Sequence, residues 1–76
     1  MTSSDILITE FLDAEWRIAE TNALIEDQRD LIEKLAYEDH DTTSAQIVLD
    51  SLCVSLALHV QTRHRLHTKV RHVKAA

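Results

Sequence analysis

The chain has 76 residues, a formal net charge of −5, one cysteine, and neither glycine nor proline. This length allows one small domain, 1–76, and such domains usually need a disulfide, a metal ion, very good helix packing or oligomerisation to be stable. The single Cys53 excludes an intrachain disulfide, and the lack of glycine and proline, on which tight turns depend, argues against a β-rich fold.

The first predicted element is an amphipathic helix over about 4–38. Thr2, Ser3 or Ser4 can cap its start, and Asp5 suits the positive N-terminal end of a helix. Its apolar residues recur with alternating spacings of four and three, which is the heptad pattern of helix–helix packing. This row, the first seam, consists of Leu7, Phe11, Ala14, Ile18, Thr21, Ile25, Gln28, Ile32 and Leu35.

A turn is predicted at 39–43, where the residues Asp-His-Asp-Thr-Thr interrupt the apolar pattern. Asp, Ser and Thr side chains bond back to nearby backbone amides and therefore favour turns and caps. Thr43 followed by Gln46 has the form of a capping box, and Asp41 is an alternative cap. Because the segment has no glycine, one continuous helix of about 70 residues is a second interpretation.

The second predicted element is a helix over about 44–74. Its apolar row, the second seam, consists of Ala45, Leu49, Leu52, Leu56, His59, Arg63, Leu66, Val70 and Val73. A chain reversal near Thr42 places the two seams against each other, so that Leu35 faces Leu49 and Phe11 faces Val73. Short connections favour antiparallel neighbours. The predicted fold class is therefore all-α, an antiparallel two-helix hairpin.

Polar residues interrupt the middle of both seams. The predicted register puts Thr21 beside Arg63 and Gln28 beside Leu56, with His59 close by. Buried polar groups need hydrogen-bond partners, so this layer is interpreted as a satisfied network that fixes the register of the helices. An anion-binding pocket at His59 and Arg63 is the alternative. The predicted polar layer consists of Thr21, Gln28, His59 and Arg63.

Apolar residues outside the seams predict that the hairpin needs a partner. One such row on the first helix contains Ile8, Leu12, Trp16, Ala19 and Ala23, and the second helix is apolar nearly all round from residue 47 to residue 60. A helix that is apolar all round is normally buried, and two-fold dimers are the commonest homo-oligomers. We expect two hairpins to form a homodimeric four-helix bundle, with another protein as the alternative partner. The expected oligomer interface is Leu12, Trp16, Leu24, Leu31, Val54 and Leu58.

Charge is divided unevenly along the chain. Residues 1–41 hold 12 acidic and three basic residues, whereas 42–76 hold one acidic and five basic residues, the latter all at Arg63 or beyond. Opposite charges in the two halves favour an antiparallel arrangement. The basic end also makes phosphate or nucleic-acid binding an alternative function. The pI of about 5.4 and the lack of aromatic residues among the bases argue against that alternative.

His64 and His67 are the candidate metal ligands, because residues three apart share a face of a helix. A zinc site needs three or four ligands, so these two would require symmetric copies at a dimer interface. Catalysis by a Ser/His/Asp triad needs a held geometry and an oxyanion site, and nothing in a glycine-free hairpin suggests one. We expect no enzyme activity and no cofactor, but a structural or regulatory interaction module.

The sequence also allows a prediction of the cellular compartment in which the protein resides. Residues 1–10 lack the basic region of a signal peptide. The most apolar window, Ile47–Val60, has 14 residues and contains Asp50 and His59, whereas a membrane-spanning helix needs about 20 apolar residues. One unpaired thiol suits a reducing environment. We therefore expect a cytoplasmic protein without membrane contact.

Residues 31–66 resemble a group of short uncharacterised proteins from alphaproteobacteria, especially rhizobial relatives. The group's pattern is a helix end with Leu-Ile and Leu, then Gly-His-Asp-Thr-Thr, then a helix with Leu-x-x-His and Arg-x-x-Leu. Asp39 stands where the group has its glycine. The resemblance implies two helices and a turn, and it implies no activity. The matching positions are Leu31, Ile32, Leu35, His40, Asp41, Thr42, Thr43, Leu49, Leu56, His59, Arg63 and Leu66.

Overall fold

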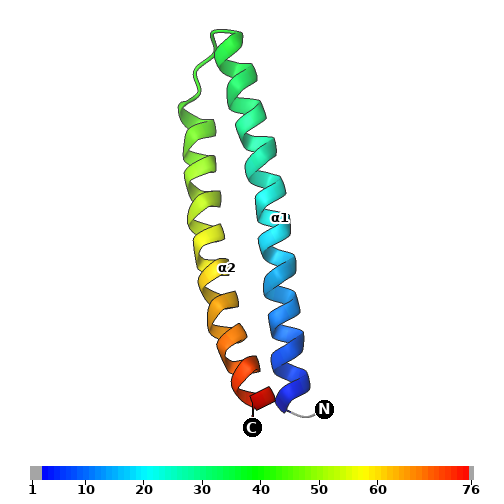
Figure 1. Cartoon of the computed structure of the whole chain (residues 1–76). Helices are drawn as coiled ribbons and strands as arrows, with labels where there is room; N and C mark the ends of the chain where they lie inside the picture. Colours follow the sequence, from blue (N-terminus) through cyan, green and yellow to red (C-terminus); the bar gives the residue numbers. More distant parts are fainter. Residues whose placement is uncertain (1–2, 76) are drawn as a thin grey trace.

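The computed structural model describes residues 3–75, which form two long helices in an antiparallel hairpin (Figure 1). Helix α1 spans Ser3–Tyr37 and helix α2 spans Thr43–Ala75. They lie side by side in a rod of 58 × 16 × 15 Å. The predicted all-α hairpin is confirmed, with helix bounds that agree to within one residue, and the single continuous helix is wrong. Thr2 and the side chain of Val73 lie outside the described residues.

Helix α1 ends in a Schellman motif, in which backbone amides beyond the helix bond back to its last carbonyls. The amide of His40 donates to the carbonyl of Leu35 at 2.8 Å, and the amide of Asp39 donates to the carbonyl of Ala36 at 3.1 Å. Asp39 has a φ of 59°, in the left-handed region where a side chain crowds the backbone. The motif therefore forms without the glycine that usually occupies this position.

Replacing Asp39 by glycine should stabilise the hairpin. Glycine adopts a positive φ without steric cost, so we expect a gain of about 1 kcal/mol and a thermal midpoint roughly 4–8 °C higher. Circular dichroism at 222 nm would measure the midpoint. Glu38→Gly is the matched control, because Glu38 has no positive φ and glycine there only increases the entropy of the unfolded chain. A midpoint for Asp39→Gly at or below that of the parent would contradict this account.

The start of α2 is held by Asp41. Its carboxylate Oδ1 accepts hydrogen bonds from the backbone N–H of Thr43 at 2.9 Å and from the Thr43 hydroxyl at 2.7 Å. The backbone bond first, and then the hydroxyl bond, lower the pKa of the Asp41 carboxyl below its usual value, because both stabilise the ionised form. Thr43 is the first residue of α2, so the capping-box interpretation is wrong and the alternative cap, Asp41, is correct.

The core of the hairpin is thin. Among the described residues, no large side chain is fully buried. The residues that are buried all belong to the two predicted seams: Ala14, Ile18, Thr21, Ile25, Ala45 and Leu66. The remaining predicted seam residues whose side chains the structure describes are half-buried: Leu7, Phe11, Gln28, Ile32, Leu35, Leu49, Leu52, Leu56, His59, Arg63 and Val70. The heptad pattern therefore identifies which faces meet, although they bury little.

The register between the helices differs from the predicted one. The ring of Phe11 lies 5.8 Å from that of His67, six residues before the Val73 predicted to face it. The guanidinium of Arg63 lies 3.5 Å from the carboxylate of Glu15, whereas Thr21 was its predicted neighbour. Both contacts show that α2 is shifted along α1 by about one heptad relative to the predicted register.

The path of the turn explains this displacement. The prediction assumed a symmetric reversal near Thr42. Instead, residues 40–42 are not helical, and the chain runs back along the end of α1 before α2 begins (Figure 1). Helix α2 therefore starts below the end of α1, and each of its residues lies opposite an earlier part of α1. A shift of one heptad keeps the same seam residues facing each other, so the spacing pattern alone did not reveal it.

Candidate interaction surface

The four residues of the predicted polar layer do not form one network. The side-chain amide of Gln28 donates to the backbone carbonyl of Ala45 at 3.0 Å, near the start of α2. Arg63, which pairs with Glu15, lies 18 residues beyond Ala45 on the same helix, or about 27 Å away. Thr21 is buried between these positions. The predicted polar layer is wrong because its residues were paired in the predicted register, and the path of the turn shifts the helices out of that register.

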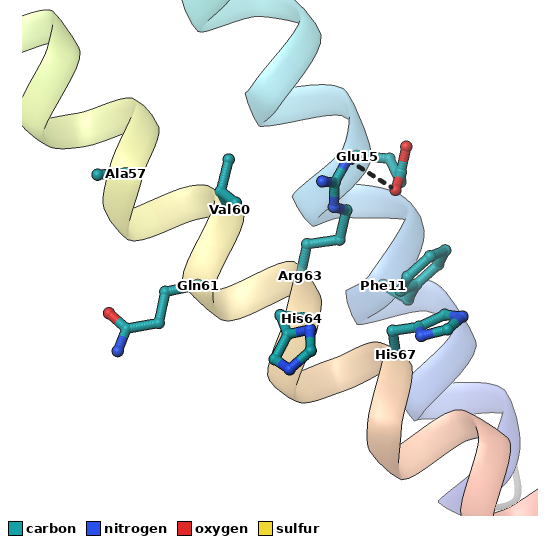
Figure 2. A pocket seen from close by; sticks show the side chains of 8 residues that line it. All are labelled: Phe11, Glu15, Ala57, Val60, Gln61, Arg63, His64 and His67. Carbon is teal, nitrogen blue, oxygen red and sulfur yellow. Dashed lines mark ion pairs between the residues drawn. The ribbon is translucent and has the colours of Figure 1, made fainter.

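A groove of about 640 Å³ runs between the helices near the termini (Figure 2). Arg63 reaches from α2 toward Glu15 on α1, and His67 lies against Phe11. The Arg63–Glu15 side chains are both more than a third exposed, so this ion pair contributes only about 0–1 kcal/mol. The groove, here called the Arg63 groove, is lined by Phe11, Glu15, Ala57, Val60, Gln61, Arg63, His64 and His67.

The candidate metal ligands His64 and His67 both line the Arg63 groove. Over the described part of the chain, no three His, Cys, Asp or Glu side chains gather where they could hold a metal ion. Glu15, the acidic residue of this groove, is engaged by Arg63. A metal site would therefore need ligands from a second copy, as the alternative prediction supposed.

A second groove, of about 320 Å³, lies on the other side of the seam, since Glu15 and Arg17 are two residues apart and project to opposite sides of α1. His59 lines it and is half-buried. The Arg17 side chain donates to the Asp13 carboxylate at 2.9 Å, and this hydrogen bond, followed by the attraction of the charges, raises the pKa of Arg17. His59 and Arg63 thus open into different grooves, and the predicted anion pocket between them is wrong.

The predicted oligomer-interface residues all lie on the surface of the single hairpin. Trp16 is the most exposed of them, at 67% of its side-chain and backbone area. The set comprises Leu12, Trp16, Leu24, Leu31, Val54 and Leu58. Ile6 and Tyr37 are also exposed, although they were not among the predicted interface residues. Counting every apolar residue outside the seams would have found them.

Helix α2 is also long and apolar enough to cross a membrane, judged by length and composition over Thr43–His72. The 14-residue window considered in the sequence was shorter because it took only the most apolar stretch, Ile47–Val60. The core helix of a soluble protein can pass the same test, but such a helix is mostly buried. Here little of the apolar window is buried, so α2 exposes an apolar surface on the outside of the hairpin.

Comparisons of the chain with protein-family models, curated proteins and solved structures gave no match. The resemblance to short alphaproteobacterial proteins therefore stays a prediction. The structure by itself defines the class of protein, which is a small helical hairpin with a thin core and an extensive exposed apolar surface.

Proposed function

We propose that this chain is a self-associating helical interaction module, with a structural or regulatory role and no catalysis. Two copies pair through their exposed apolar surfaces into a four-helix bundle. The proposal rests on one observation, which is that more large apolar side chains are exposed than buried. Among the side chains that the structure describes, twelve large hydrophobic ones are exposed, whereas only five hydrophobic residues are buried, two of them alanines.

The energetics support pairing over most of this surface. Full burial of an aliphatic side chain contributes about 1.5–3 kcal/mol, and the exposed residues here have about half of that left to gain. Six such residues on each of two chains would contribute about 9–18 kcal/mol, which is similar to or larger than the cost of association, about 4–15 kcal/mol. A small contact would not suffice, so the interface must use most of the apolar surface of each hairpin.

A lipid membrane is the second candidate occupant, because α2 has the length and composition of a spanning helix. Insertion of α2 would remove it from α1 and expose the buried faces of Ile18 and Ile25. It would also carry Asp50 and Arg63 toward the hydrocarbon, where charges are costly. A second copy covers the same surface and leaves both seams intact, so we favour it.

Sedimentation equilibrium at micromolar concentration tests the proposal. We expect a mass of at least twice the 8.7 kDa of one chain, with helix content that falls on dilution as the copies separate. A folded 8.7 kDa species at every concentration would overturn self-association. Flotation of that monomer with anionic lipid vesicles would then assign the apolar surface to a membrane.

A further inference from the structure

One stripe of exposed residues on α1 changes from apolar to acidic along the helix. The apolar row Ile8, Leu12, Trp16, Ala19 and Ala23 continues at the same helical spacing as the acidic row Glu26, Asp30 and Glu33. All eight side chains are exposed. The stripe is therefore apolar from the open end of the hairpin to mid-length and acidic from there toward the turn.

Charge is divided in the same way over the hairpin as a whole. The half next to the turn, residues 24–55, contains eight acidic and two basic residues. The open half, formed by residues 3–23 and 56–75, contains five acidic and six basic residues together with four histidines. The exposed bases Arg65, Lys69 and Arg71 all lie on α2 in this open half. A rod with these ends repels a parallel copy and attracts an antiparallel one.

We infer that the second copy docks antiparallel, with the turn half of each hairpin over the open half of the other. This inference rests on the proposed self-association and adds its orientation and its contact surfaces. The apolar row of each α1 lies over the turn half of the partner, where Ile47, Val48 and Val54 of α2 are exposed. The acidic row of each α1 lies beside the basic part of the partner's α2. The interaction is isologous, as a two-fold dimer requires.

The spacing along the rod agrees with this arrangement. Contacts such as Glu15–Arg63 place Glu20 of α1 level with about Ala57 of α2, near the middle of the hairpin. The acidic row from residue 26 to residue 33 lies about 9–20 Å from that level toward the turn. The basic segment from residue 63 to residue 69 lies about 9–18 Å from it toward the open end. A two-fold rotation at mid-length brings the two segments to the same height.

The partner's acidic row then also faces the Arg63 groove. In the single chain this groove presents two histidines and an arginine whose charge is shared with Glu15. Carboxylates from a second copy supply acceptors for hydrogen bonds from the Arg63 guanidinium and from the imidazole N–H groups of His64 and His67. We therefore assign the groove to the partner's α1 and not to a free phosphate or a nucleic acid.

Double electron–electron resonance with one spin label per chain tests the orientation. The labels are placed in a Cys53→Ala background at exposed positions, either at the turn through His40→Cys or at mid-length through Glu20→Cys. In the antiparallel dimer, the two labels at position 40 lie about 50 Å apart, because the rod is 58 Å long and the turns are at opposite ends. The two labels at position 20 lie within about 30 Å in either orientation, since packed helices are about 8–10 Å apart.

The outcomes separate the orientation from the self-association on which it rests. A long distance at position 40 with a short distance at position 20 is the expected result. Short distances at both positions would mean a parallel dimer and would overturn the orientation alone. The absence of a dipolar signal at position 20, with the chain folded, would mean that no second copy is bound and would overturn both proposals.

Discussion

Replacing Ile25 by aspartate should unfold the hairpin. Ile25 lies at the centre of the seam and is only 5% exposed. The substitution removes a buried aliphatic side chain, worth about 2–5 kcal/mol on truncation alone, and places an unpaired carboxylate where it has no partner. A small domain has only about 5 kcal/mol of total stability, so the combined loss should abolish the cooperative transition. Circular dichroism at 222 nm, as a function of temperature and urea, would show it.

Asn22→Asp is the matched control for this experiment. Asn22 lies on the same helix, one turn from Ile25, and is exposed. The substitution adds the same charge without placing it in the seam, so its melting curve should stay within a few degrees of the parent. If Ile25→Asp melted like Asn22→Asp, the assignment of this face of α1 to the interhelical seam would fail.

Replacing Trp16 by glutamate should separate the proposed dimer into single chains. Trp16 is two-thirds exposed in one hairpin and sits near the middle of the apolar row on α1. Buried aromatic residues near the centre of an interface often contribute 2 kcal/mol or more, so each substituted chain should weaken association by at least roughly 30-fold. Sedimentation velocity over a concentration series would measure the shift, and circular dichroism would follow the helix content of the released chains.

Tyr37→Glu provides the comparison for Trp16→Glu. Tyr37 is aromatic, lies on the same helix and is 90% exposed, but it follows the acidic row at the turn end of α1. The proposed interface is centred far from it, so this variant should keep the mass of the parent. An unchanged mass for Trp16→Glu would remove Trp16 from the interface, and dissociation by both variants would indicate a general effect of added negative charge.

The sequence predicted the parts of this structure that depend on local periodicity. The alternation of four and three identified both seams, because a helix repeats its faces every three to four residues whatever it packs against. The break at residues 39–43 was visible because Asp and Thr compete for backbone amides. These features are encoded within a few residues, so the sequence of one chain was enough to reveal them.

The register was not predictable in the same way. It depends on the backbone path from Asp39 to Thr42, and a left-handed φ at a non-glycine residue is not evident from residue type alone. A heptad pattern fits equally well after a shift of seven residues, so the pattern did not correct the error. The predicted meetings of Gln28 with Leu56 and of Thr21 with Arg63 both failed for this one reason.

The sequence predicted only part of what the structure shows on the outer surface. Leu12, Trp16 and Leu58 were expected at an interface because they fall outside the seams, and the structure places them on the surface of the single hairpin. Association with another molecule decides what covers them, and local periodicity does not encode that association. The pairing of Arg63 with Glu15 was missed, since a side chain that long reaches residues that helical spacing alone does not select.

A lone hairpin with an acidic turn end and a basic open end is an electric dipole nearly 60 Å long. Two copies related by a perpendicular two-fold axis cancel that dipole, so the pair exposes no complementary ends for a third copy to join. Growth into filaments would instead need copies staggered head to tail. In the proposed dimer, the uneven charge therefore does more than orient two chains, because it also opposes the addition of a third copy.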